Sequence, residues 1–400
     1  MAYISKKNTF MDFVIRAIIV SILFENMQII SIMGAGFKLL HLILILCILR
    51  QLITRPLKLK ALTLGIIFLL IPVLPLYRIN DIVEWFKSYV IYVILVLFFV
   101  TSLEEFCHCF SQKRVTYVRF FIKTIAVSQV LGIIQFVMMN AFGVFFLKDF
   151  FGPFAFHHCQ FGVSAGFYRA YSLFFEPSFF AWVCNAALAV LLYCGNNCFS
   201  TRKKNWYLGL TLIALFSTLS SSGIIIGVCI LVLNQFVFSK NAGKIFVACI
   251  GTFFVILFIW LFTDLLSPIE RLFYEINTEN TSGYERLITP LLYIEQTFRY
   301  FPICGRGIGQ EGYVDAVGVI GRYPGIHNAL LGIIACFGLT SLFFYVPAIS
   351  YCVKRVSENR KWALLLVSLG GIYISTGAFI AVDTFLFLIL ILAVGHNENV

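Results

Sequence analysis

The chain has 400 residues, of which 60% are hydrophobic and only 12% are charged, and its formal net charge is +11. Soluble domains usually carry about 25% charged residues, so this composition excludes an ordinary soluble domain and predicts residence in a membrane. The apolar runs are continuous and do not alternate, which favours an all-α polytopic membrane protein over a closed barrel. No basic and aromatic recognition motif accompanies the positive charge, so no nucleic-acid partner is predicted.

About twelve apolar segments are predicted to cross the membrane within a single domain over residues 1–400. They occupy residues 13–33, 36–53, 61–77, 86–103, 117–139, 177–195, 206–221, 223–238, 245–266, 327–350, 362–380 and 383–395. Several are shorter than the ~20 residues that a spanning helix needs. The first run is long and lacks a small-residue cleavage site, which indicates a membrane anchor and not a cleaved signal peptide.

Basic residues set the expected orientation of these segments. They recur in alternate loops, at Lys6, Lys7, Arg50, Arg55, Lys58, Lys60, Lys113, Arg114, Arg202, Lys203, Lys204, Lys240, Lys244, Lys354, Arg355, Arg360 and Lys361. Lysine- and arginine-rich loops face the cytoplasm, so both termini are predicted to be cytoplasmic. Two long extracytoplasmic loops then cover residues 143–176 and 267–326, and long loops on a rigid scaffold often carry function.

Ionisable residues in the first apolar run need partners. Asp12 and Arg16 are four residues apart and can pair on one helical face. Glu25 is deeper, where a charge is costly, and we interpret it as a structural or lining residue. Most of the twelve cysteines lie in apolar runs and act as small hydrophobic residues. Cys159 and Cys304 both fall in the outer loops, where they can form a disulfide with each other.

The stretch Tyr168–Trp182, YRAYSLFFEPSFFAW, enters the sixth predicted span with one cation and one anion. Glu176 precedes Pro177, and proline suits the first turn of a helix, so Glu176 alone can be explained as a helix cap. Arg169 lies near the membrane surface, where its side chain can extend to water. The alternative is that both residues form part of a functional site at the outer mouth of the helix bundle.

All five basic residues of the second long loop are arginines: Arg271, Arg286, Arg299, Arg306 and Arg322. Arginine binds phosphate and carboxylate groups through a rigid two-pronged fork, whereas lysine acts as a point charge. The pattern therefore indicates a phosphate or pyrophosphate ligand, although the same loop has seven acidic residues and structural Arg–Glu pairing is an equal alternative. Within this loop, the segment Glu285–Arg299 is predicted to form an amphipathic helix at the membrane surface. Pro290 disfavours a continuous helix there.

Two further features follow in the same loop. Gly305, Gly307 and Gly309 form GxGxG, which is too weak for a nucleotide motif and is better interpreted as a turn that lets backbone approach a ligand. His327 and Asn328 then open the tenth predicted span. Histidine titrates near neutral pH and can act as a general base, while a polar pair that starts a helix is the simpler interpretation.

Four stretches taken together resemble the O-antigen polymerase/ligase family, which includes the Wzy-type polysaccharide polymerases. They are Arg169 with Glu176-Pro177-Ser178, the polar turn STLSSSG (Ser217–Gly223), the run from Tyr284 to Gly309, and the start of the tenth span at His327, Asn328 and Gly338. The resemblance covers roughly residues 115–350. Ser221-Ser222-Gly223 departs from the family, which more usually has a serine-arginine pair in this turn.

This resemblance implies a glycosyltransferase that uses undecaprenyl-diphosphate-linked sugars. Arg169 and Arg286 would bind the diphosphate, and Arg306 and Arg322 are further candidates for phosphate contact. His327 would take the proton from the acceptor hydroxyl. The leaving group is already good, so no cofactor and no metal are expected.

The same resemblance implies that Glu176 orients Arg169 or the acceptor. It also implies a multi-pass protein of the bacterial inner membrane with its active site facing the periplasm. A chain-length regulator, a flippase and membrane lipid are the expected partners, besides the lipid-linked oligosaccharide.

Three functions fit these features. A polymerase moves the growing glycan to the next lipid-linked repeat unit, and the EPS motif and the two sizeable outer loops favour it. An O-antigen ligase instead moves the finished glycan to lipid A core. A twelve-span transporter or flippase fits the span count, but two-half transporters usually show an internal repeat, and the sequence has none.

Overall fold

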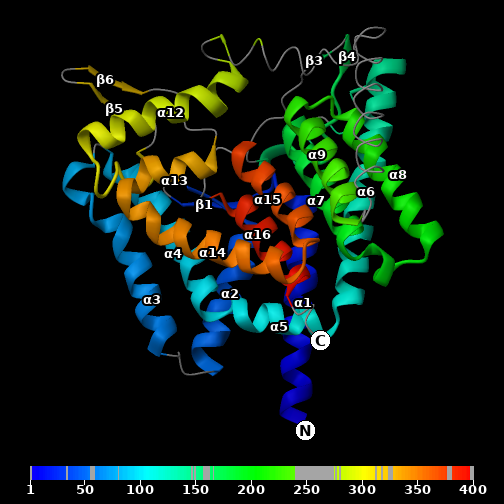
Figure 1. Cartoon of the computed structure of the whole chain (residues 1–400), viewed down its shortest axis with the longest axis horizontal. Helices are drawn as coiled ribbons and strands as arrows, with labels where there is room; N and C mark the ends of the chain where they lie inside the picture. Colours follow the sequence, from blue (N-terminus) through cyan, green and yellow to red (C-terminus); the bar gives the residue numbers. More distant parts are fainter. Residues whose placement is uncertain are drawn as a thin grey trace.

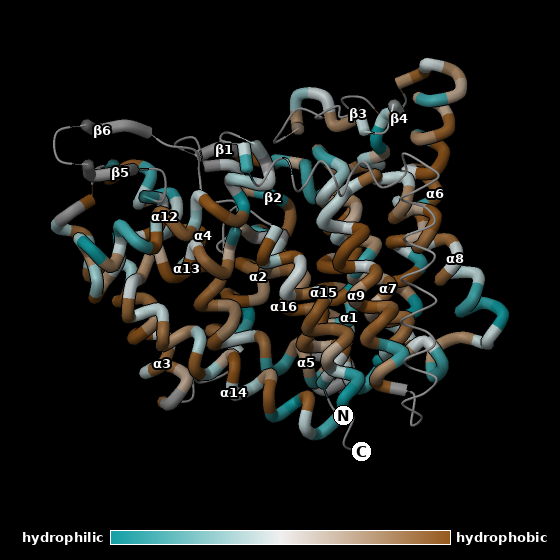
Figure 2. The backbone as a smooth tube through the Cα atoms, turned by 45° about the horizontal axis from the view of Figure 1, so that its top comes forward, coloured by the Kyte–Doolittle hydropathy of each residue, from teal (hydrophilic) through white to brown (hydrophobic). Residues whose placement is uncertain are grey.

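The structure, a computed structural model, describes residues 2–32, 35–54, 59–79, 81–145, 147, 150–155, 163–164, 166–238, 274, 277–278, 281–310, 313–316, 319–322, 328–375 and 381–396. Helices dominate this part of the chain and run alongside one another as a bundle (Figure 1). Hydrophobic residues line the middles of the helices, and hydrophilic residues gather toward the two ends of the bundle (Figure 2). This distribution fits a protein that crosses a membrane.

Most of the longer helices follow the apolar runs of the sequence. The longer helices are α1 (Ala2–Ser21), α2 (Leu39–Thr54), α3 (Leu59–Leu70), α4 (Ile82–Thr101), α5 (Leu103–Gln112), α6 (Arg114–Phe142), α7 (Pro177–Cys198), α8 (Thr201–Ser217), α9 (Ser221–Phe238), α12 (Ser282–Tyr300), α13 (Ala329–Phe337), α14 (Leu342–Glu358), α15 (Trp362–Ser375) and α16 (Val382–Gly395). Of these, α5 and α12 are amphipathic. Short 3₁₀ turns connect or extend them at Ile22–Phe24, Ile71–Val73, Leu76–Arg78, Gly152–Phe154 and Gly338–Ser341.

Three short antiparallel hairpins complete the described structure. They pair β1 (Gln28–Ile32) with β2 (Ala35–Lys38), β3 (Val163–Ser164) with β4 (Phe167–Tyr168), and β5 (Tyr313–Ala316) with β6 (Val319–Arg322). The hairpins β3–β4 and β5–β6 lie with α12 at one end of the bundle, away from the start of α1 and the end of α16 (Figure 1). The described parts of the two long loops therefore share one side of the molecule.

The main core surrounds α7. This helix packs against α6, α8, α9 and α15, and its buried residues include a series of alanines: Ala181, Ala186, Ala187 and Ala189. Small residues let helix backbones approach closely where lipid provides no hydrophobic driving force between helices. Gly223 of α9 shows how close this approach is, because a Cβ atom added there would lie 2.4 Å from Cβ of Ala181.

Among the described residues, four helical segments are long and apolar enough to cross a membrane: Ile82–Thr101, Arg114–Phe142, Pro177–Cys198 and Ala329–Glu358. Five shorter apolar helices accompany them, at Leu39–Thr54, Ala61–Val73, Ser221–Val237, Trp362–Ser375 and Thr384–Gly395. These segments confirm a helical, multi-pass membrane protein. The count of twelve spans and the cytoplasmic side stay predictions, and the ninth predicted span, residues 245–266, lies outside the described residues.

The first predicted span, residues 13–33, is wrong at its outer end. Helix α1 ends at Ser21, and the chain continues through the Ile22–Phe24 turn into the β1–β2 hairpin. The isoleucines at 29, 30 and 32 that extended the apolar run are β-branched and suit a strand. Glu25 pairs there with Lys38 at 2.7 Å, and both side chains are buried. Of the two interpretations of Glu25, a structural residue or a lining residue, the buried pair with Lys38 supports the structural one.

The tenth predicted span, residues 327–350, is not one continuous helix. It divides into α13 and α14 at a 3₁₀ turn that begins at Gly338, whose φ is +53°. A Cβ atom at Gly338 would come within 2.6 Å of the Pro302 carbonyl oxygen, so the break lets the GxGxG turn approach. Helix α5 was also not predicted, because it is a short amphipathic helix between two spans.

Two local predictions are confirmed. Arg16 Nε lies 2.9 Å from Asp12 Oδ2, so the predicted pair forms. The amphipathic segment Glu285–Arg299 lies within helix α12, which continues through Pro290. Leu291, Leu292 and Phe298 are exposed on α12, and its position at the membrane surface stays a prediction. Cys159 and the histidines at 157 and 158 lie outside the described residues, so the Cys159–Cys304 disulfide is likewise untested.

Candidate functional site

Two side-chain amides of α6 hold the segment that leads into α7, and one of them, Gln135, is buried. Asn140 receives a hydrogen bond from the Tyr168 backbone N–H at 2.7 Å and donates to the Tyr168 carbonyl oxygen at 3.0 Å. One turn deeper, Gln135 Oε1 accepts from the backbone N–H groups of Tyr171 and Ser172, both at 2.8 Å. Ser172 has φ +55°, a conformation that non-glycine residues rarely adopt. The path of the chain toward Glu176 is therefore fixed by contacts within the protein.

Arg169 contacts the turn between α8 and α9. Its Nε donates to the Thr218 carbonyl oxygen at 3.1 Å, and the next backbone N–H, of Ala170, donates to the Ser217 carbonyl oxygen at 3.0 Å. The STLSSSG stretch contains the predicted turn at residues 218–220, with Leu219 at φ +45°, and its last three residues begin α9. Since Gly223 packs against Ala181, this turn lies beside the first turns of α7. Two of the four resembling stretches meet there.

Glu176 and Arg286 form an ion pair between the two long loops. Arg286 Nη2 lies 3.5 Å from Glu176 Oε1, and the two side chains are 21% and 20% exposed. Glu176 occupies the N-cap position of α7, but its side chain makes no capping hydrogen bond. Glu176 therefore takes the predicted cap position, but its carboxylate is directed to Arg286 and does not cap the helix. Structural Arg–Glu pairing is confirmed for Arg286, although the acid comes from the first loop.

Asn328 joins the same group of residues. Its Nδ2 donates to the Arg286 carbonyl oxygen at 3.1 Å, and its Oδ1 accepts from the Leu331 backbone N–H at 3.1 Å. Asn328 is the N-cap of α13 and is buried, which confirms the helix-start interpretation for this residue. His327 lies outside the described residues. The contact of Asn328 nevertheless brings the start of α13 to Arg286.

Arg306 lies in the GxGxG turn and faces α12. Its Nη2 donates to Gln296 Oε1 at 2.7 Å, its guanidinium stands 5.5 Å from the ring centroid of Tyr293, and the residue is only 6% exposed. These contacts hold α12 on the turn. Arg322 ends β6, and its side chain is outside the described part of the structure. The described contacts do not bring Arg306 to the Glu176–Arg286 pair.

The three glycines of GxGxG form a turn, all with positive φ, but protein atoms fill the space that was assigned to a ligand. A Cβ atom at Gly305 would meet the Cys336 carbonyl oxygen at 2.3 Å, and one at Gly309 would meet the Glu84 carbonyl oxygen at 2.6 Å. The Gly307 backbone N–H also donates to the Cys336 carbonyl oxygen at 2.9 Å. The prediction that this turn approaches a ligand is therefore wrong, because its glycines pack closely against the backbone of α13 and α4.

Gln135 and Asn140 were missed as positioning residues. Each has a detectable signal, because an uncharged amide at an apolar helix position is costly unless it is hydrogen bonded. The segment that they position leads to Glu176, whose partner Arg286 places a half-buried guanidinium at the start of α7. A guanidinium carries five N–H donors, and the contact with Glu176 engages a single terminal nitrogen. Such a group can bind an anionic ligand that arrives from the bilayer.

A comparison with protein families identifies the family of the chain. The family model described as WcaD colanic acid polymerase matches residues 14–397. The chain belongs to this family. Membership in the WcaD colanic acid polymerase family makes it a polysaccharide polymerase, a glycosyltransferase-type enzyme, and confirms the resemblance to Wzy-type polymerases. No curated protein and no solved structure matches the chain significantly.

Proposed function

We propose that this protein transfers a growing glycan from undecaprenyl diphosphate to a hydroxyl group of the next lipid-linked repeat unit at the extracytoplasmic face. The acceptor oxygen attacks the anomeric carbon of the donor, and the bond from that carbon to the diphosphate oxygen breaks. Undecaprenyl diphosphate leaves with the bonding electrons, and the hydroxyl proton passes to a base. The family description gives colanic acid as the product class.

The Glu176–Arg286 pair is the observation that carries the proposal. It joins two outer loops at the start of α7, the helix around which the bundle packs. A diphosphate that emerges from the bilayer needs a cation near the membrane surface, since its charge grows as the glycosidic bond breaks. Arg286 is suited to this task because a guanidinium binds two phosphate oxygens at once.

Glu176 has a positioning role in this proposal. Its distance of 3.5 Å from Arg286 is long for a charge-assisted hydrogen bond, so the contact orients the guanidinium without closing it to other anions. Asn328 fixes the Arg286 backbone from the other side. Arg169, beside the first turns of α7, is the second cation proposed for the diphosphate, and Arg306 and Arg322 remain weaker candidates.

His327 is the proposed base. The imidazole is the side chain best matched to proton transfer near neutral pH, and a positioned base contributes about 10²–10⁴-fold to such reactions. His327 directly precedes Asn328 in the sequence, and Asn328 contacts Arg286. Neither a metal nor a cofactor is required in this mechanism. A chain-length regulator and a flippase are proposed partners, and the bacterial inner membrane is the proposed location.

A deletion strain complemented with single variants tests this proposal. Surface polysaccharide from the strain is separated by size, and membrane levels of each variant are measured. We expect the deletion to leave single repeat units and wild type to restore polymer. Arg286→Ala should lower polymer formation about 10²–10³-fold, the usual cost of removing one donor that stabilises developing negative charge. Arg286→Lys should restore part of it.

Arg299→Ala is the matched control, because Arg299 lies on α12 as Arg286 does but is exposed near the end of the helix. It should support normal polymer. Polymer of wild-type length from Arg286→Ala would discard the site while keeping the enzyme. A deletion that leaves no surface repeat unit at all would indicate a ligase or a flippase, and one with unchanged polymer would refute the proposed activity in that host.

A further inference from the structure

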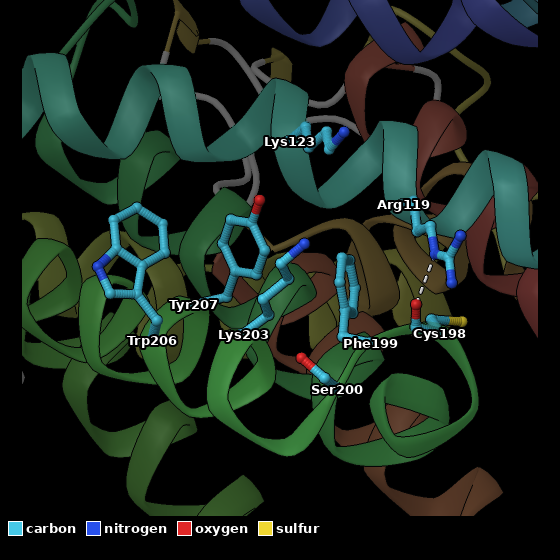
Figure 3. A pocket seen from close by; sticks show the side chains of 8 residues that line it. All are labelled: Arg119, Lys123, Cys198, Phe199, Ser200, Lys203, Trp206 and Tyr207. Carbon is cyan, nitrogen blue, oxygen red and sulfur yellow. Dashed lines mark hydrogen bonds between the residues drawn. The ribbon is translucent and has the colours of Figure 1, made fainter.

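A basic and aromatic pocket of about 380 Å³ lies between α6 and the start of α8, at the end of α7 opposite to Glu176. Arg119 and Lys123 of α6 face Lys203, Trp206 and Tyr207 of α8 across it, with Phe199 between them (Figure 3). Helix α8 forms the outer edge of the bundle here (Figure 1). We propose that this pocket binds the phosphate headgroup of an anionic phospholipid.

Charge is the first reason. Three cations line the pocket and no acidic residue does. Among the described residues, Arg119, Lys123 and Lys203 have no ion pair, although Arg119 Nε donates to the Cys198 carbonyl oxygen and is held at the wall by it. Three uncompensated cations around one cavity repel each other. A phosphate between them relieves this repulsion and accepts their hydrogen bonds.

Depth is the second reason. Helix α6 begins at Arg114, so Arg119 and Lys123 stand roughly 8 and 14 Å along its axis at 1.5 Å per residue. Both fall inside the predicted span 117–139, where an unpaired charge is costly. The lysine- and arginine-rich α7–α8 turn assigns this end of the bundle to the cytoplasm, where anionic lipid headgroups attract basic residues.

The surface beyond the pocket supplies the third reason and distinguishes a lipid from free phosphate. Val127, Val130 and Ile134 continue the exposed face of α6 that carries Arg119 and Lys123. Ile213 and Phe216 are exposed further along α8. Acyl chains below a bound headgroup have an apolar surface to lie on. Trp206, 59% exposed, and Tyr207 suit the interface between headgroups and chains.

This inference does not depend on the proposed polymerase activity, since the site lies at the other end of the bundle. Its test uses the full-length protein in phosphatidylcholine nanodiscs. Phosphatidylglycerol with acyl chains brominated near the headgroup is added in steps, and quenching of Trp206 fluorescence is recorded. Trp206→Phe supplies the background from the other tryptophans. Brominated phosphatidylcholine at equal mole fractions gives the non-specific quenching.

We expect half-maximal quenching at a several-fold lower mole fraction of phosphatidylglycerol than of phosphatidylcholine. Removal of one cation should abolish most of this preference, because one basic residue near an anionic surface changes affinity about five-fold. The triple variant Arg119→Ala/Lys123→Ala/Lys203→Ala should lose it. Lys123→Ala alone, an exposed position, keeps the test valid if the triple variant does not fold.

The matched control removes three exposed basic residues from the same predicted side but outside the pocket, Arg202→Ala/Lys354→Ala/Arg360→Ala. It should keep the preference. Equal quenching by both lipids in wild type would overturn the proposal, as would an equal loss in the control, which indicates general surface charge only. If inorganic phosphate reverses the quenching, the pocket binds a free anion, and the proposal of a lipid headgroup is overturned.

Discussion

Helices α4 and α7 have similar lengths, 20 and 22 residues, and both are apolar enough to cross a membrane. Their surroundings differ. In the most apolar stretch of α4, 28% of the residues are buried inside the protein, against 89% in α7. Helix α7 carries buried alanines, while α4 exposes Ile82, Val83, Phe86 and Phe99. Small residues, more than apolarity, therefore distinguish the central helix from a peripheral one.

The difference places the candidate site on the rigid part of the molecule. Glu176 directly precedes α7, and the preceding segment is held by Gln135 and Asn140. If α7 is the centre of the bundle, substitutions around it should cost far more stability than substitutions on α4. Thermal unfolding of purified protein in one detergent measures this for all variants below.

The largest effect is expected for Gln135→Leu. The change leaves the backbone N–H groups of Tyr171 and Ser172 without the acceptor that both now use. A buried donor without a partner costs about 1–3 kcal/mol, so we expect a loss of about 3 kcal/mol in the free energy of unfolding. Val137→Thr on the exposed face of α6 is the control. A loss below 1 kcal/mol for Gln135→Leu would show that the segment is not anchored there.

Gly223→Ala should follow. The added methyl group meets Cβ of Ala181 at 2.4 Å, so α9 must move away from α7 at a cost of about 1–3 kcal/mol. Gly209→Ala on α8 is a close control, because nothing lies within 4 Å of its added Cβ. That change should be neutral or raise stability by up to about 1 kcal/mol. Similar unfolding temperatures for the two variants would contradict tight packing at α7.

On α4, Asp81→Ala should have a moderate effect. Asp81 Oδ1 accepts from the backbone N–H groups of Val83 and Glu84, both at 3.0 Å, and so caps the helix. Loss of such a cap costs about 1 kcal/mol. Asp81→Asn keeps the acceptor and should restore most of the stability. Equal losses for both variants would assign the effect to charge and not to capping.

Phe99→Ala on α4 should have the smallest effect. The Phe99 ring is exposed on the protein and contacts detergent or lipid, so its removal leaves no cavity. Changes away from cores and caps usually stay within about 0.5 kcal/mol. A loss comparable with that of Gly223→Ala would remove the distinction between the two helices and indicate that α4 packs against a partner on this face.

The helical framework could be predicted because apolar runs in a membrane leave few alternatives to a helix. The predicted limits of α2, α6 and α7 differ from the observed ones by only a few residues. The β1–β2 hairpin could not be predicted in the same way, since Ile29 and Ile30 are as apolar as a spanning helix requires. Nor could the break at Gly338, which depends on backbone from the distant turn at Pro302.

Less of the candidate site could be predicted. The sequence identified Glu176 and Arg286 separately, and local pattern favoured a helix cap for the first. Their contact joins residues 110 positions apart, and no local rule gives such a pairing. The composition of the second loop gave no reason to separate Arg306 from Arg286. In the structure, Tyr293 and Gln296 on α12 bury Arg306. Which arginine faces the mouth is decided by tertiary packing.

The separation of Glu176 from Arg286 also has a consequence for biogenesis. A ribosome that has completed the first outer loop must add 110 further residues before Arg286 exists, which takes roughly 5 to 20 seconds at 5–20 residues per second. Helix α7 is made within that interval, so Glu176 and its helix exist before the partner of the carboxylate does. The contact between the two outer loops therefore forms late in synthesis, after α12 has begun.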